Sequence, residues 1–303
     1  MDFEQMLREA LQSEDSVCRY MEPMSSHTTF RIGGPAQFFV IPGNAEDLSA
    51  VLRLCARNSM PWKVLGNGSN LLVSDRGCDG VVISMEGKWS YGEADGAVLR
   101  AGSGMLLSRA ASLALRESLA GMEFASGIPG TVGGALVMNA GAYGSEMKDI
   151  LLSAKVMTPE GEVKTLQAPE LKLGYRTSSI PGEGFIVLEA ALSLTPGNRE
   201  LIEAQMKELA RRRREKQPLE YPSAGSTFKR PQGYFAGKLI EESGMRGFRL
   251  GGAQVSEKHC GFVINAGNAT ASDVMDLCRH VSRAVKEQFD VELEMEVRRW
   301  GEF

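Results

Sequence analysis

The sequence predicts an α+β fold, with a larger first part and a smaller C-terminal part. Helical and strand-like patterns mix along the chain without the strict β-α alternation that a doubly wound sheet requires. A break at Thr195-Pro196-Gly197 separates the two parts, and each part carries its own apolar patterns. At 303 residues the chain is long enough for two or three compact units with buried cores.

The first part opens with a helix and continues mostly as strands. Phe3, Met6, Leu7 and Leu11 fall on one face of a helix over residues 3–11. Apolar spacing predicts two more helices, over 44–58 and 104–118. Runs of β-branched and apolar residues predict a strand pair over 28–40, around Gly33-Gly34-Pro35, and further strands. Those strands cover 61–65, 71–73, 81–85, 98–101, 154–157, 163–166 and 185–194.

The C-terminal part contains two helices and a final strand. Asn198 can cap a helix that Pro218 ends. Thr270-Ala-Ser-Asp273 forms a capping box that opens a second helix, which runs to Phe289. Residues 291–297 alternate strictly between apolar and acidic side chains, which predicts a strand with one buried face.

Composition and charge exclude several classes of function. With 43% hydrophobic and 24% charged residues and no long apolar run, the chain is predicted to be globular and not to span a membrane. A net charge of −4 argues against nucleic acid as the main partner. The acidic N-terminus argues against export. The five dispersed cysteines and three histidines show no metal-ligand spacing, so we expect a reduced, cytoplasmic protein without a metal site.

The most informative segment is Gly127 to Gly144, which holds six glycines in eighteen positions. Glycine at this density is expected where the backbone passes close to a flat or charged group, or turns with positive φ. The polar groups on offer are main-chain N–H groups, Thr131 and Asn139, with no acid or base among them. Such a segment is typical of one that wraps a large cofactor and directs amides at its phosphates.

A second glycine-rich loop, Gly66-Asn67-Gly68-Ser69-Asn70, follows a predicted strand and precedes Leu71. No Lys-Ser or Lys-Thr follows the glycines, so the loop is not a Walker loop. It also lacks the third glycine of a Rossmann fingerprint. Two such loops in one chain together favour a dinucleotide site.

Three polar clusters could carry chemistry, although each also has a purely structural interpretation. Arg176 could clamp a carboxylate or phosphate, or could be a loop surface residue. Ser226 lies in a glycine- and serine-bearing loop without a neighbouring base, which favours a turn-forming role. Glu296 shares the polar face of the predicted final strand with other glutamates and reads as a solvated residue. The basic run Arg211 to Arg214 could solubilise a helix end or bind an anion.

Taken together, these segments resemble the UDP-N-acetylenolpyruvoylglucosamine reductase (MurB) family, in its shorter second type. The resemblance extends from His27-Thr-Thr-Phe-Arg-Ile-Gly-Gly-Pro35 to Glu296-Val-Arg298 and so covers nearly the whole chain. It includes both glycine-rich loops, Tyr175-Arg176-Thr-Ser and Ala224-Gly-Ser-Thr-Phe-Lys-Arg-Pro231. It implies a vanillyl-alcohol-oxidase-type FAD-binding domain of two subdomains, at 1–95 and 96–196, followed by a substrate domain at 197–303.

The resemblance also implies the residues of the site. The implied catalytic residues are Arg176, Ser226 and Glu296, and the implied substrate-binding residues are Tyr175, Lys216, Arg213 and Lys238. The implied cofactor-binding residues come from the two glycine-rich loops: Gly66, Asn67, Gly68, Ser69, Asn70, Leu71, Gly127, Ile128, Gly130, Thr131, Gly133, Gly134, Asn139, Ala140 and Gly141.

The implied activity is reduction of the enolpyruvyl ether of UDP-N-acetylglucosamine to UDP-N-acetylmuramate in peptidoglycan precursor synthesis. NADPH is the implied reductant and non-covalent FAD the implied cofactor. Ser226 protonates the substrate carbanion, while Arg176 and Glu296 stabilise the enolate. We expect a monomer or a weak homodimer.

Two other functions remain open from the sequence. One is an FAD-linked oxidase of the same superfamily, with His27 or Cys78 as an attachment point. The other is a non-catalytic module that binds a nucleotide sugar.

Overall fold

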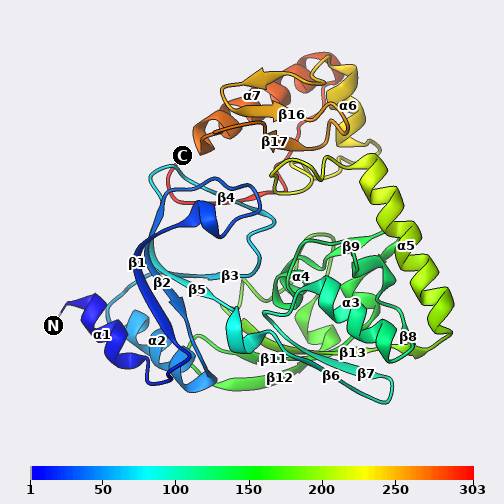
Figure 1. The fold of residues 1–303 in the computed structure, drawn as a ribbon. Helices are drawn as coiled ribbons and strands as arrows, with labels where there is room; N and C mark the ends of the chain where they lie inside the picture. The colour runs from blue at the N-terminus through cyan, green and yellow to red at the C-terminus, as the bar shows by residue number, and fades with distance from the viewer. Residues whose placement is uncertain (1) are drawn as a thin grey trace. The chain divides into compact units, whose positions relative to one another are not determined.

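A computed structural model describes residues 2–303, and these form two compact units (Figure 1). The first unit contains residues up to 20, 38–67 and 80–212, and the second contains 21–37, 68–79 and 213–303. Both units combine helices with sheets, which confirms the predicted α+β class. The predicted boundaries near residues 95 and 196 stay predictions.

One sheet of the first unit has four strands in the order β1-β2-β5-β3. These are β1 (Val17–Pro23), β2 (Pro35–Ile41), β5 (Cys78–Ser84) and β3 (Trp62–Leu65). The helices α1 (Phe3–Ala10) and α2 (Ala45–Arg57) contribute Leu7, Leu48 and Leu52 to its core. Asp47 fixes the connection after α1, because its carboxylate accepts hydrogen bonds from the Gln12 and Ser13 amides and from Ser16 Oγ.

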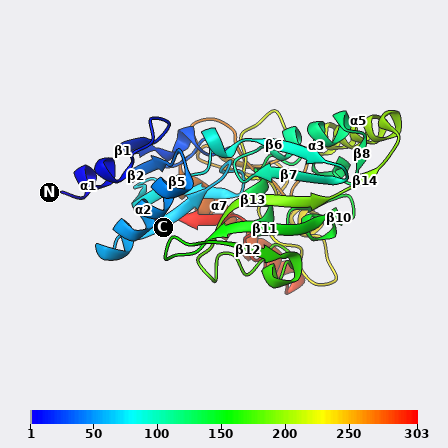
Figure 2. The ribbon, with the colours of Figure 1, turned by 90° about the horizontal axis from the view of Figure 1, so that it is seen from below.

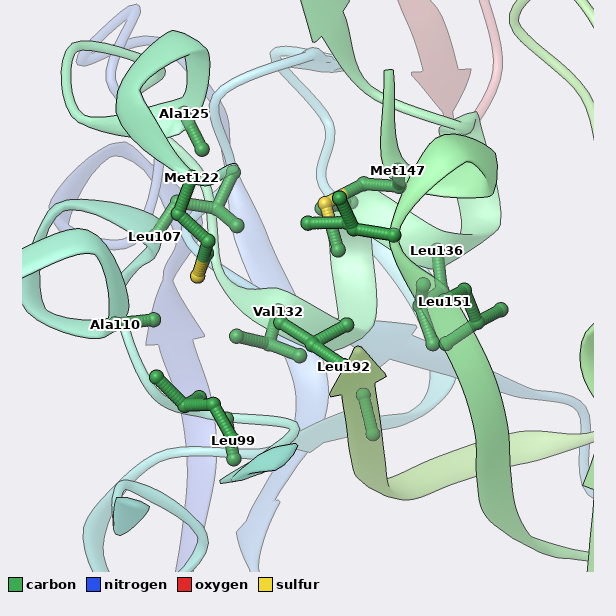
Figure 3. Packing of buried hydrophobic residues seen from close by; sticks show 14 of the residues in the cluster. Leu99, Leu107, Ala110, Met122, Ala125, Val132, Leu136, Met147, Leu151 and Leu192 are labelled. Carbon is green, nitrogen blue, oxygen red and sulfur yellow. The ribbon is translucent and has the colours of Figure 1, made fainter. Parts of the chain in front are cut away.

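The other large sheet of the first unit has five antiparallel strands, which Figure 2 shows side by side. Their order is β12 (Val163–Gln167), β11 (Leu151–Met157), β13 (Ile186–Ser193), β7 (Val98–Gly102) and β6 (Gly92–Asp95). Leu99 and Leu192 of this sheet belong to the same buried cluster as Leu107, Val132 and Leu136 (Figure 3). The last three come from α3 (Leu107–Arg116) and α4 (Val132–Met138).

Short elements connect these layers. They are β8 (Leu119–Ala120), β9 (Gly141–Ala142), β10 (Ser145–Glu146) and β14 (Thr195–Pro196), with single-turn 3-10 helices at Met24–Ser26, Gly87–Trp89, Glu123–Ala125, Met147–Asp149 and Ala168–Leu171. The long helix α5 (Arg199–Lys216) follows β14 and buries Ile202 and Leu209.

The second unit is built around α7 (Ala271–Phe289). The predicted capping box at its start is present between Thr270 and Asp273. Asp75, far away in the sequence, also accepts hydrogen bonds from the Ala271 and Ser272 amides. The other elements are β4 (Leu71–Val73), α6 (Ala236–Glu242), β15 (Arg249–Leu250), β16 (Ala253–Val255), β17 (Val263–Asn265) and β18 (Arg298–Trp300). Strand β18 pairs in parallel with β4.

Two predictions of regular structure were wrong. Only the second half of the predicted strand pair over 28–40 is a strand, because Thr28 to Ile32 forms a turn in which Arg31 has φ +55°. The strand β1 was missed. The alternating segment 291–297 contains one isolated bridge, between Met295 and Phe228, and no regular strand. Its alternation is nevertheless real in packing, since Val297 is buried and Leu293 and Met295 contact the core.

Within residues 2–303, no helix is both long and apolar enough to cross a membrane. The described residues also contain no group of three or more His, Cys, Asp or Glu side chains suited to a metal ion.

Candidate cofactor and substrate site

The two glycine-rich loops touch each other in the first unit. A Cβ atom added to Gly66 would lie 2.5 Å from Thr131 Oγ1, so glycine allows this approach without displacing the hydroxyl. Asn67 Nδ2 donates a hydrogen bond to the Pro129 carbonyl at 3.1 Å. The loops that the sequence pointed to separately therefore form one surface, here called the glycine-loop cluster.

The start of α4 uses its amides inside the chain. The Val132 amide donates to the Met105 carbonyl, and the Gly133 amide to the Ser103 carbonyl. The Gly134 amide donates to Thr131 Oγ1, which caps the helix. A Cβ atom at Gly133 would lie 2.8 Å from Ser103 Cβ, so this glycine serves close packing. The expectation that all these glycines direct amides at phosphates is thus too simple, and cofactor contacts of Gly133 and Gly134 stay predictions.

The remaining surface of the cluster fits a flat polar cofactor such as FAD. Its predicted residues are partly exposed and carry little side chain, so that a ligand can approach the backbone. These residues are Gly66, Asn67, Gly127, Ile128, Gly130, Gly134, Ala140 and Gly141. Thr131, Gly133 and Asn139 are buried and support the surface from below.

Arg176 stands at the tip of a tight turn in the first unit. Gly174 and Thr177 exchange two backbone hydrogen bonds, of 3.0 and 3.3 Å, around Tyr175 and Arg176. Arg176 has φ +55°, which is uncommon for a residue other than glycine. Its Cζ lies 5.5 Å from the centroid of the Tyr175 ring, which is itself 58% exposed.

Both ends of this turn are tied to α4. Asn139, fully buried at the end of α4, donates from Nδ2 to the Gly174 carbonyl at 3.1 Å and to Glu146 Oε2 at 2.8 Å. Ser178 Oγ donates to the Val137 carbonyl at 2.9 Å. Ser178 did not stand out in the sequence. The available signal was a serine shortly after the predicted arginine, which is too common a pattern to be diagnostic.

The segments that carry Ser226 and Glu296 pair with each other in the second unit. The Glu296 amide donates to the Thr227 carbonyl at 2.8 Å, and the Lys229 amide donates to the Glu294 carbonyl at 2.8 Å. These bonds and the antiparallel bridge between Phe228 and Met295 pair the segment that carries Ser226 with the segment that carries Glu296, although the two are far apart in the sequence. Ser226 is exposed and Glu296 is half-buried. We call this arrangement the Ser226–Glu296 cluster.

The second half of the first glycine-rich loop supports this cluster. Asn70 donates from Nδ2 to the Glu296 carbonyl at 3.2 Å, and its own carbonyl accepts from the Arg298 amide at 3.0 Å. Gly68 has φ +60°, and a Cβ there would lie 2.2 Å from the His27 carbonyl oxygen. Leu71 lies in β4, next to Arg298 of β18. Residues 66–67 thus belong to the first unit and 68–71, including Ser69, to the second.

The predicted substrate-binding cations lie on two helices. Arg213 and Lys216 are in the last turns of α5, and Lys238 is exposed on α6, 3.6 Å from Glu242. Arg211 and Arg212 both pair with Glu208. Hydrogen bonds from these two arginines lower the pKa of Glu208 to about 2. Arg211 and Arg212 of the basic run are therefore engaged in ion pairs within the helix.

Comparison with known proteins agrees with this organisation. Residues 36–167 match the model of an FAD binding domain, which confirms the predicted cofactor. Residues 217–300 match the C-terminal domain of UDP-N-acetylenolpyruvoylglucosamine reductase.

Similar proteins cover nearly the full chain. A protein of Lachnoclostridium phytofermentans named UDP-N-acetylenolpyruvoylglucosamine reductase is 52% identical over 98% of this chain and 97% of its own length. One from Clostridium perfringens with the same name is 50% identical over 98% and 97%. The crystal structure of the reductase from Thermus caldophilus superposes with a TM-score of 0.81 at 36% identity, covering 94% of this chain and 99% of that one.

A more distant structure shows the fold alone. The glucose dehydrogenase Phl p 4.0202 matches with a TM-score of 0.50 at 15% identity, over 66% of this chain and 45% of its own. From the matches over the whole length, this chain belongs to the UDP-N-acetylenolpyruvoylglucosamine reductase family of FAD-containing oxidoreductases.

Proposed function

We propose that this protein reduces the enolpyruvyl ether of UDP-N-acetylglucosamine to UDP-N-acetylmuramate, with NADPH as the reductant. The reaction belongs to peptidoglycan precursor synthesis in the cytoplasm. The observation that carries the proposal is 52% identity, over 98% of the chain, to a relative named for this reduction.

The glycine-loop cluster holds FAD. Gly66, Asn67 and the residues from Gly127 to Gly130 contact the cofactor through accessible backbone. Buried Thr131 keeps the two loops together through its contact with Gly66. When bound, FAD supplies the hydride that it has accepted from NADPH.

Arg176 and Glu296 act on the substrate carboxylate. Hydride addition to the terminal vinyl carbon leaves negative charge on the neighbouring carbon and on that carboxylate. The Arg176 guanidinium stabilises this charge by donating hydrogen bonds to the carboxylate oxygens. Glu296 in its protonated form donates to the same oxygens, because an ionised carboxylate would repel them.

Ser226 completes the reduction by protonating the carbanion carbon. A serine hydroxyl is a weak acid in water, but a carbanion is a strong enough base to remove its proton. The exposed position of Ser226 supports this role, since the hydroxyl is open to a substrate and can regain a proton from solvent. Tyr175, Lys216, Arg213 and Lys238 bind the carboxylate or the diphosphate of the substrate.

The decisive experiment follows the flavin without oxygen. NADPH should bleach the visible absorbance of the purified protein, and the enolpyruvyl nucleotide sugar should then restore it. A protein that bleaches but is not reoxidised by this substrate would contradict the proposal. Flavin that stays with the acid-precipitated protein would indicate a covalently linked oxidase.

A further inference from the structure

We infer that Asn139 and Ser178 are positioning residues that fix Arg176 through helix α4. The inference rests on the proposed role of Arg176 and deepens it. Neither side chain is assigned a contact with substrate. Each acts by tying one end of the turn that carries the guanidinium to the end of α4.

The turn needs this support because of its own geometry. Tyr175 and Arg176 lie between the two backbone hydrogen bonds that Gly174 makes with Thr177. Arg176 adopts φ +55°, a conformation that is unfavourable for a residue other than glycine. Bonds that hold the two ends of such a turn favour one conformation of Arg176 over others.

Asn139 holds the first end of the turn with a side-chain amide whose oxygen and nitrogen both form hydrogen bonds. Its two N–H groups donate to the Gly174 carbonyl and to Glu146 Oε2, and its Oδ1 accepts from the Lys148 amide at 2.9 Å. Glu146 is itself fixed, because it pairs with Lys148 and its amide donates to Asp149. The Asn139 side chain is 0% exposed and therefore has no freedom to reorient toward a ligand.

The backbone explains why asparagine occupies this position. Residue 139 ends α4 with φ 42° and ψ 58°, and the Ala140 amide closes the helix on the Ala135 carbonyl. Glycine and asparagine are the residues that favour this left-handed position. Only asparagine adds an amide group that can reach Gly174.

Ser178 holds the second end of the turn. Its Oγ donates to the Val137 carbonyl, one of the last carbonyls of α4. Its neighbour Ser179 makes a similar bond, but to the Glu170 carbonyl, which does not belong to α4. The two serines thus make the same type of hydrogen bond, but Ser178 bonds to α4 and Ser179 bonds to Glu170.

Helix α4 connects this clamp to the glycine-loop cluster. Thr131 caps its start and contacts Gly66, and Gly133 packs on Ser103. At the other end of this seven-residue helix, Asn139 and the Val137 carbonyl hold the arginine turn. This short helix therefore fixes the position of the Arg176 turn relative to the glycine-loop cluster.

The test compares half-reactions of the FAD-loaded full chain. Asn139→Gly keeps the left-handed backbone and removes the amide, and Ser178→Ala removes the hydroxyl. Each should slow flavin reoxidation at saturating enolpyruvyl substrate about tenfold, and the double variant about 10²-fold, the scale expected when a reacting group is misplaced. Flavin content and the rate of reduction by NADPH should change less than about twofold.

Two controls separate positioning from general damage. Ser179→Ala should leave the reoxidation rate within about twofold of the wild type. In an Arg176→Ala background, Asn139→Gly should cause no further loss, because residues that act through one group are not additive.

A further loss from Asn139→Gly in the Arg176→Ala background would overturn the inference, as would equal losses from Ser178→Ala and Ser179→Ala. So would loss of flavin from Asn139→Gly, which would make Asn139 a cofactor residue. If Asn139→Gly fails to fold, the pair of serine variants decides alone. Wild-type protein that the substrate does not reoxidise would instead show that the proposed function itself has failed.

Discussion

The turn that carries Arg176 and the Ser226–Glu296 cluster hold their reactive side chains in different ways. In the first, side chains form the bonds: Asn139 Nδ2 donates to the Gly174 carbonyl, and Ser178 Oγ donates to the Val137 carbonyl of α4. In the second, backbone pairing adds to a side-chain bond, since the Glu296 amide donates to the Thr227 carbonyl and the Glu296 carbonyl accepts from Asn70 Nδ2. A side-chain hydrogen bond can be removed by a single substitution, whereas a backbone hydrogen bond depends on the conformation of the chain.

This difference has a consequence for how each region tolerates substitution. The hydroxyl of Ser226 is a reacting group on a scaffold that does not need it. The turn that carries Arg176, in contrast, is held by the polar side chains of Asn139 and Ser178, and we expect their removal to displace Arg176. Substitutions should therefore have separable effects in the Ser226–Glu296 cluster and coupled effects in the turn.

The largest effect is expected for Ser226→Ala. Because Thr227 and Glu296 hold the segment by backbone bonds, the variant should fold and bind FAD as before. Loss of the proton donor should slow the reoxidation half-reaction about 10²- to 10⁴-fold, while NADPH still reduces the flavin normally. Stopped-flow absorbance measures both steps. Equal slowing of the two would remove Ser226 from the proposed role.

A smaller effect separates the two glycines of one loop. Gly68→Ala places a Cβ 2.2 Å from a backbone carbonyl at φ +60°, so we expect a loss of about 3 kcal/mol in unfolding free energy. Gly66→Ala meets the Thr131 hydroxyl instead, at 2.5 Å. That group can move at the expense of the helix cap, a cost of about 1 kcal/mol. Urea titration checks the order, which equal losses would contradict.

The smallest effect is a loss of stability at low pH, and it should involve one carboxylate in each unit. Burial raises the pKa of Asp47, but hydrogen bonds from Ser16, Ser13 and Gln12 outweigh it and leave the pKa below the ordinary 3.8. Amide donors from Gly252 and Thr270 likewise lower the pKa of Asp273. A lowered pKa in the folded state stabilises the protein above the ordinary value, and this contribution is lost as the pH falls through the folded-state pKa.

Asp47→Asn and Asp273→Asn should therefore lower the urea midpoint at pH 7 and have less effect at pH 3. A difference from the wild type that stays constant between these two pH values would show that the carboxylates are not linked to stability. Asp276→Asn, at an exposed carboxylate paired only with Arg279 on the surface of α7, serves as a control with little expected change.

Much of the fold followed from sequence because periodicity reports burial. The helices at 44–58 and 270–289 were predicted within a residue or two, since their apolar faces and caps are local signals. The segment 291–297 shows where this reasoning fails. Alternation reports that one face is buried, but a strand also needs a bonded neighbour, and only Met295 has a bridge.

The candidate site divides in the same way. Glycine density predicted the glycine-loop cluster, because glycine is the residue that makes a backbone accessible and the sequence shows it directly. Ser226 and Glu296 have no local feature that distinguishes them from a turn serine and a surface glutamate, and only the resemblance of the whole chain pointed to them. The pairing of the segments that carry them depends on the bonds between 227–229 and 294–296, which no pattern within either segment encodes.

The pairing of β18 with β4 limits how this protein can be cut and recombined. A fragment beginning at residue 213 would keep α7 but lose Asp75 at its start and the parallel neighbour of its last strand. Chimeras that exchange the carboxyl-terminal portion between homologues must therefore carry 21–37 and 68–79 along with it. Evolution by simple shuffling of this portion is correspondingly disfavoured, because three separate stretches would have to move together.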